Sequence, residues 1–172
     1  MDLLCELVPK AAFIAVLMDP NFVTELSAVE DAGRALGRQV LVVTAASERE
    51  LDAAFAQIVQ AGAGALVVGG GPFFTSQRQR LTTLAARHAI PAIYDAREDV
   101  EAGGLMSYGT NIADAYRHAG LYTGRILQGA KTSELPVMQP TTFELVINRK
   151  TAKTLGLTIP QTLLVAADEI IE

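Results

Sequence analysis

The sequence predicts an α/β domain in which a three-layer arrangement places helices on both faces of a mainly parallel sheet. Short apolar runs rich in Val and Leu recur along the chain, without the alternation typical of a strand with one face in water. Amphipathic stretches separate these runs, and the connections are short, as in sheets built from right-handed crossovers. Half of the 172 residues are hydrophobic and 19 % are charged, which excludes a disordered chain.

Length and charge limit the organisation and the partners. A chain of 172 residues fits one domain, 1–172. The net charge of −5 and the lack of basic clusters argue against a nucleic-acid partner and favour small molecules or proteins. Asp2 and Glu6 occupy the start, where a secretory signal would carry basic residues, so as written the chain is expected to be cytoplasmic. Cys5, the single cysteine, is expected to be an ordinary apolar residue.

The first half of the chain is expected to alternate helix and strand. Pro9 closes the first helix, Gly37 ends the second, and Ser47 with Glu50 forms a capping box at the start of the third. The expected elements are a helix at 2–7, a strand at 13–18, a helix at 22–36, a strand at 39–44, a helix at 48–61 and a central strand at 63–68.

The second half continues this order and then becomes less regular. Arg78, Arg80 and Arg87 are expected on the solvated face of one helix, and two prolines indicate an extended linker before the last strand. The expected elements are a helix at 76–88, strands at 89–94 and 105–109, a helix at 112–127, the linker at 131–142, an edge strand at 143–148, a helix at 151–155 and a closing segment.

A glycine-rich loop directly follows the central strand. Gly69–Gly71 let the backbone turn tightly and approach a ligand, and Pro72 and Phe73 follow at once. In open α/β sheets, ligands bind outside the carboxyl ends of the strands, where this loop is expected. The loop is therefore predicted to form one wall of a small-molecule site, the alternative being an ordinary turn beside two core aromatics.

Polar residues after other strands are expected at the same edge of the sheet. Carboxylate and amide oxygens there would suit an ammonium group or hydroxyls, and Phe73, Phe74 or Tyr94 would stack on an apolar part of a ligand. Helix capping by Asp19 and Asp95 is the alternative, and the two roles are compatible. The predicted ligand-binding residues are Asp19, Asn21, Gly71, Pro72, Phe73, Tyr94 and Asp95.

Catalytic and cofactor motifs were not found. The glycines do not follow the dinucleotide fingerprint, and the Walker lysine is missing. Ser107 lies in a sequence similar to a nucleophile elbow, but one residue too many precedes it, and neither histidine has a special claim to pair with it. A Mg²⁺ phosphoacceptor pocket would need a lysine after a later strand. The sequence thus predicts binding without catalysis, metal or cofactor.

Several motifs taken together resemble the substrate-binding proteins of ABC transporters, in the branch that includes binders of tryptophan and other aromatic amino acids. These motifs are Leu7–Pro9, Ile14–Leu17, Asp19–Asn21, Gly71–Phe74, His88–Tyr94, Gly103–Gly109 and Glu144–Asn148. The resemblance implies the fold of type I periplasmic binding proteins, in which two lobes close on a ligand. It covers only the second half of such a protein, so a fragment that lacks the first lobe and the signal is expected.

By this resemblance the chain would be the solute-binding component, or its second lobe, of an ABC-type uptake system. The ligand would be amino-acid-like or another small organic molecule, the partner a membrane permease, and the location periplasmic or at the cell surface. An effector domain of a transcription regulator shares the fold and is the alternative, although the expected helix-turn-helix is absent.

The resemblance also implies that residues 103–130 belong to the crossing between lobes. The predicted helix at 112–127 would then have an apolar face with nothing to cover it. We expect it to fold back onto its own domain, or to be covered by the first lobe or by a second copy in a homodimer.

Overall fold

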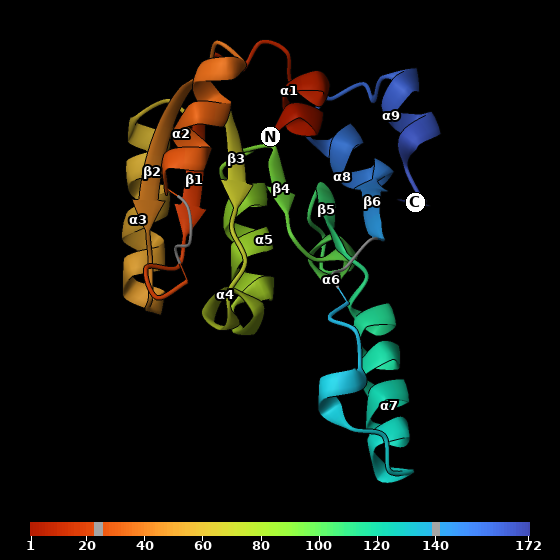
Figure 1. The fold of residues 1–172 in the computed structure, drawn as a ribbon. Helices are drawn as coiled ribbons and strands as arrows, with labels where there is room; N and C mark the ends of the chain where they lie inside the picture. Colours follow the sequence, from red (N-terminus) through yellow and green to blue (C-terminus); the bar gives the residue numbers. More distant parts are fainter. Residues whose placement is uncertain (23–25, 139–141) are drawn as a thin grey trace.

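The computed structural model describes residues 1–22, 26–138 and 142–172 (Figure 1). Its seven strands form one sheet in the order β2-β1-β3-β4-β5-β6-β7. The strands are β1 (Phe13–Met18), β2 (Gln39–Thr44), β3 (Ala65–Val68), β4 (Ala92–Tyr94), β5 (Met106–Thr110), β6 (Phe143–Asn148) and β7 (Glu169–Ile171).

Helices connect the strands and cover both faces of the sheet, so the predicted fold class is confirmed. In α3 the Ser47 half of the predicted capping box is present, since the Ser47 hydroxyl accepts from the Glu50 N–H at 3.3 Å, whereas the Glu50 carboxylate accepts from the N–H of Ala46, one residue before the N-cap, at 2.9 Å. The helices are α1 (Asp2–Leu7), α2 (Leu26–Ala35), α3 (Glu48–Gln60), α4 (Pro72–Ser76), α5 (Arg78–Arg87), α6 (Arg97–Glu101), α7 (Ile112–Leu127), η1 (Thr132–Glu134), α8 (Arg149–Thr154) and α9 (Gln161–Ala166).

The direction of the chain in the sheet changes after β5. Strands β1 to β5 pair in parallel, β5 and β6 pair antiparallel, and β6 and β7 are parallel again. The prediction of an edge strand at 143–148 is therefore wrong, because β6 lies between β5 and β7. The sequence looks alternating only because of Glu144, which lies at the partly exposed end of β6 near α7. The residues from Leu145 to Asn148 are all buried.

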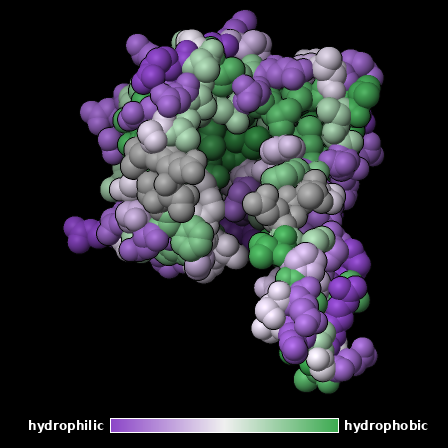
Figure 2. Space-filling model, viewed as in Figure 1, coloured by the Kyte–Doolittle hydropathy of each residue, from purple (hydrophilic) through white to green (hydrophobic). Residues whose placement is uncertain are grey.

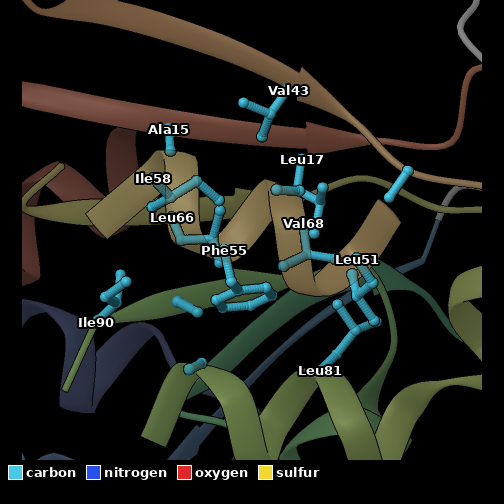
Figure 3. Close-up of a cluster of buried hydrophobic side chains, with 14 of the residues drawn as sticks. Ala15, Leu17, Val43, Leu51, Phe55, Ile58, Leu66, Val68, Leu81 and Ile90 are labelled. Atoms are coloured by element: carbon cyan, nitrogen blue, oxygen red, sulfur yellow. The ribbon is translucent and has the colours of Figure 1, made fainter. Parts of the chain in front are cut away.

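The larger part of the core lies on the face covered by α3, α4 and α5 (Figure 3). Phe55 from α3 and Leu81 from α5 are each 1 % exposed and pack with the apolar residues of β1 to β4. A second cluster on the opposite face joins α1, α8 and α9 to β5 and β6. Both faces of the central strands are thus removed from water, which explains why their sequences do not alternate.

Two predicted helices have different bounds in the structure. The helix expected at 76–88 is α5 (Arg78–Arg87), and a short helix that was not expected, α4, precedes it, because Pro72, whose fixed φ suits the first helical turn, starts a helix inside the expected loop. The helix expected at 22–36 is α2 from Leu26, and residues 23–25 lie outside the described part. Of the expected linker at 131–142, residues 132–134 form η1 and residues 139–141 are not described.

Helix α7 extends away from the sheet together with the chain that returns beside it (Figures 1 and 2). We call α7 with its flanking residues, 111–138, the α7 arm. No residue of α7 is buried, so the first of the expected alternatives, that this helix folds back onto its own domain, is wrong, and its cover by another lobe or a second copy stays a prediction. Its apolar side instead faces the returning segment, where Tyr122 donates a hydrogen bond of 2.8 Å to the Pro136 carbonyl.

Candidate functional site

The site is built from the segments that follow β1, β3 and β4, at the end of the sheet where α4, α6 and the base of α7 lie (Figure 1). Asp19 follows β1 and is 4 % exposed. Its Oδ1 accepts hydrogen bonds from the Asn21 backbone N–H at 2.9 Å and from the Asn21 side-chain amide at 3.2 Å. These bonds satisfy one carboxylate oxygen of Asp19 and turn the chain sharply away from β1.

The glycines after β3 let three loops approach one another closely. A Cβ on Gly71 would lie 3.2 Å from the Cβ and Oδ2 of Asp19, and a Cβ on Gly70 would lie 2.5 Å from Asp95 Oδ2. Gly71 also has φ +148°, a conformation that side chains disfavour. The segments after β1, β3 and β4 therefore meet at one edge, as expected from the strand ends.

Pro72, Phe73 and Phe74 continue from this loop into α4. Pro72 is exposed, and Phe73 is half-buried with its ring centroid 5.6 Å from that of Phe74. Phe74 itself is 3 % exposed and belongs to the core beneath α4. Of the two aromatic residues, only Phe73 retains surface beside the glycine loop.

Asp95 is an exposed residue, but its carboxyl group lies against the glycine loop. Loss of water around this group raises the pKa of Asp95, while a backbone hydrogen bond and the charge of Arg78 oppose the rise. A neighbouring cavity of about 270 Å³ is lined by Asp95, Arg97, Glu98, residues 109–113 and Glu144. The Asp95 carboxyl group thus borders the glycine loop, and the residue also lines this cavity.

Tyr94 does not take part in this edge. Its ring is 3 % exposed and packs in the core with α3 and α5, and its hydroxyl has no hydrogen-bond partner in the described structure. Burial, and next the charge of Asp99, raise the pKa of Tyr94. The expectation that Tyr94 contacts a ligand is therefore not supported by its placement.

Sequence reasoning missed the ion pair behind Asp95. Arg78 was expected on a solvated face, but its Nε donates to Oδ1 of Asp99 at 3.1 Å, and the two side chains are only 28 % and 8 % exposed. Burial raises the pKa of Asp99 to about 6, Arg78 lowers it, and Asp95 adds to the rise. The sequence contained one signal of this placement. Arg78 lies two residues after α4 and one helical turn before the apolar Leu81, so it lies near the helix face that Leu81 buries.

The part of the chain that the structure describes contains no group of three or more His, Cys, Asp or Glu residues that could hold a metal ion. None of the described helices combines the length and the apolar character needed to cross a bilayer. The arrangement at the sheet edge offers hydrogen-bond acceptors, close backbone approach and one aromatic face, which together suit the binding of a small polar molecule.

Comparison with solved structures shows the same fold in longer proteins. A conserved domain protein from Vibrio cholerae is 23 % identical with a TM-score of 0.86, and this chain covers 58 % of it. An ABC domain from Streptococcus pneumonia in complex with L-Trp is 25 % identical with a TM-score of 0.86, again with 58 % covered. The ligand-free, open structure of a substrate binding protein with adhesive properties from Clostridium difficile is 22 % identical, with a TM-score of 0.70 and 58 % covered.

Nearly all of this chain, 98 % to 99 %, takes part in these three matches. A search of curated proteins gave no match. The family model of the ABC transporter substrate binding proteins matches residues 1–171. The chain therefore belongs to the ABC transporter substrate binding protein family.

Proposed function

We propose that this chain is the solute-binding component, or one lobe of it, of an ABC-type uptake system. The ligand would be amino-acid-like or another small organic molecule, held at the carboxyl ends of the strands. The observation that carries this proposal is the meeting of Asp19, the glycine loop and Asp95 at one edge of the sheet, in a chain of this family.

The chemistry of this edge supports a ligand with an ammonium group and an apolar part. Asp95 would pair with the ammonium group, the backbone at Gly70 and Gly71 would allow close approach, and Phe73 would contact the apolar part. The L-Trp complex of the Streptococcus pneumonia protein supports the same class of ligand. Asp19, Asn21 and Pro72 would shape the wall of the site.

The proposed role includes a membrane permease as the partner and a location outside the cytoplasm. It involves no catalysis and no cofactor. The alternative, an effector domain of a transcription regulator, is less well supported because the matched family is one of transporter components.

We also propose that the α7 arm contacts a further lobe of the longer protein. Of the twelve large hydrophobic residues that are exposed in the described structure, nine fall between Tyr108 and Phe143. The solved relatives extend well beyond the 58 % that this chain spans, so they hold additional chain for such a lobe. A second copy of this chain is the competing occupant, and light scattering of the purified chain distinguishes a dimer from a monomer that needs the further lobe.

The proposal is tested by mapping L-Trp on the chain with two-dimensional NMR. We expect the addition of L-Trp to shift the backbone signals of Asp19, Gly70, Gly71, Phe73 and Asp95. Indole serves as the matched control, because it keeps the apolar ring but lacks the ammonium group that Asp95 would hold. Shifts confined to other surfaces, or equal shifts with indole, would contradict the proposed site.

A further inference from the structure

Arg78 connects the two segments that carry the proposed ligand contacts. It is the first residue of α5, and one residue separates it from the short α4 that begins at the glycine loop. Its partner Asp99 lies in α6, four residues after Asp95, and the Arg78 Nε donates to Asp99 Oδ1 at 3.1 Å. The ion pair therefore joins the element after β3 to the element after β4.

Neutral hydrogen bonds hold α6 and the turn after it in the same place. The Thr82 hydroxyl lies 3.2 Å from the Ala102 carbonyl and shares its proton between this acceptor and the Arg78 and Gln79 carbonyls of its own helix, which places α5 directly beside this turn. On the other side, the Asn148 amide donates to the Val100 carbonyl at 3.3 Å, and the Thr151 hydroxyl donates to the Gly103 carbonyl at 3.0 Å. With its position fixed in this way, Asp99 cannot easily move away from its neighbours.

The charges around Asp99 are unbalanced without Arg78. Asp95 and Glu98 both act on Asp99 as neighbouring anions, and the Tyr94 ring lies beside it as a neutral group. Arg78 is the cation that acts on both Asp95 and Asp99. Asp99 is only 5 % exposed, so water cannot take over the role of that cation.

We propose that Arg78 is a positioning residue of the ligand site. It holds the glycine loop and α4 against the Asp95 segment, and its charge allows Asp95 and Asp99 to be anions at the same time. This inference rests on the proposed function in one respect, namely that Asp95 holds the ammonium group of the ligand.

Loss of Arg78 should therefore raise the pKa of Asp95, although the hydrogen-bond partner of Arg78 is Asp99. Without the cation, the pKa of Asp95 rises, because the charge of Arg78 no longer favours the anionic form of this carboxyl group. A larger fraction of Asp95 would be neutral at mildly acidic pH, and a neutral carboxyl group binds an ammonium group less well. Lysine at position 78 would keep the charge but not the planar guanidinium, so it should restore most of the effect.

The first experiment follows the Asp95 carboxyl carbon by NMR during a pH titration of the ligand-free chain. We expect the pKa of Asp95 to be higher in Arg78→Gln than in the original chain, and close to the original value in Arg78→Lys. Arg34→Gln is the matched control, because the Arg34 side chain is 76 % exposed and, among the described residues, pairs only with Asp31. An Asp95 titration that is the same in Arg78→Gln and in the original chain would overturn the proposal.

A second pair of variants covers the case in which Arg78→Gln does not fold. Asp99→Asn removes the buried anion, so that the loss of Arg78 then leaves no unpaired buried charge. Adding Arg78→Gln to Asp99→Asn leaves two neutral groups that can still form a hydrogen bond, and it should raise the pKa of Asp95, because Asp95 loses the charge of Arg78. Equal titration of Asp95 in these two variants would contradict the role of Arg78.

The binding experiment measures the affinity for L-Trp as a function of pH in the original chain, Arg78→Gln and Arg78→Lys. We expect Arg78→Gln to bind about tenfold more weakly at mildly acidic pH, with the difference shrinking as pH rises and Asp95 ionises. A purely structural role would weaken binding equally at every pH, which would count against the proposal. Failure of the original chain to bind L-Trp would contradict the proposed ligand class, while the ligand-free titration still decides the role of Arg78.

Discussion

Apolar side chains are buried in one region of the molecule and exposed in another. The first region is the part of the sheet that carries the proposed ligand edge, and the second is the α7 arm. In residues 13–101, large hydrophobic side chains fill the core between the sheet and α3 to α5. In the arm, no residue of α7 is buried, and the apolar side of the helix borders a groove of about 500 Å³ against residues 132–138. Figure 2 shows the arm as a projection with mixed hydrophobic and hydrophilic surface.

This difference indicates which part of the chain is stable by itself and which part depends on a contact. Burial of apolar surface stabilises a fold by about 25 cal/mol per Å², and this gain is absent for the outward residues of the arm. Exposed apolar patches of more than a few hundred Å² on soluble proteins mark interaction surfaces. Residues 13–101 thus form the packed support of the proposed ligand edge, and the α7 arm carries the exposed apolar residues on which the proposed contact with a further lobe depends.

The largest expected effect compares one core residue with one arm residue. Phe55→Ala should lower the free energy of unfolding by about 3 to 5 kcal/mol, because Phe55 is 1 % exposed and its loss leaves a cavity under the sheet. Leu127→Ala, at a residue that is 83 % exposed, should change it by less than about 0.5 kcal/mol. Denaturant unfolding measures both values. Similar losses for the two variants would remove the contrast between core and arm.

The pH dependence of stability tests the burial of Asp99. Its pKa is raised to about 6 in the folded chain, so its contribution to stability is fully present below its unfolded pKa and is lost as pH rises through 6. Between about pH 4 and 7, the stability of the original chain should fall by roughly 1 to 3 kcal/mol through this group. The Asp99→Asn variant should lack that decline.

Asp31→Asn, at an exposed site with a side chain 67 % accessible, serves as the control for this experiment. Urea unfolding at a series of pH values gives the slope for each protein. A slope that Asp99→Asn leaves unchanged would show that Asp99 is not buried as described.

A smaller effect is expected at the turn after β1. Asp19→Ala removes the acceptor of two hydrogen bonds from Asn21 and should cost about 1 to 2 kcal/mol. Asn21→Ala keeps the backbone bond and should cost less. Thermal unfolding of the two variants gives this order, and the reverse order would show that the Asp19 carboxylate does not hold the turn.

The smallest effect is expected within the arm. Tyr122→Phe removes the hydrogen bond to Pro136 without changing the ring, at a cost of about 0.5 kcal/mol. Because the arm stands apart from the core, this change should speed hydrogen exchange in residues 112–127 and leave β1 and β3 unaffected. Faster exchange in the central strands would mean that the arm and the sheet unfold together.

Much of the fold could be predicted because the local signals are strong. The bounds of β1, β2, α7 and β6 agree with the apolar runs and the helical period, and the Ser47 cap starts α3. The meeting of three loops at one edge followed from the parallel order of the strands.

The remaining features depend on contacts that a sequence pattern does not show. Ala92 and Tyr94 lie on the same face of the short β4, and with both faces covered nothing in the sequence indicates that Tyr94 points into the core. The reversal at β6 is set by pairing with β5 and β7. Arg78 and Asp99 are 21 residues apart, and only the packing of α5 beside α6 brings them together.

The most direct test of the central claim is calorimetric titration of L-Trp into the original protein and its Asp95→Ala variant. If the ligand site lies at the carboxyl edge of the sheet, the variant should lose about 1 to 3 kcal/mol of binding free energy, which is roughly 5- to 150-fold in affinity. Asp31→Ala, which removes a carboxylate from an exposed surface, should bind like the original protein. Equal L-Trp affinity in the original protein and in Asp95→Ala would contradict the account.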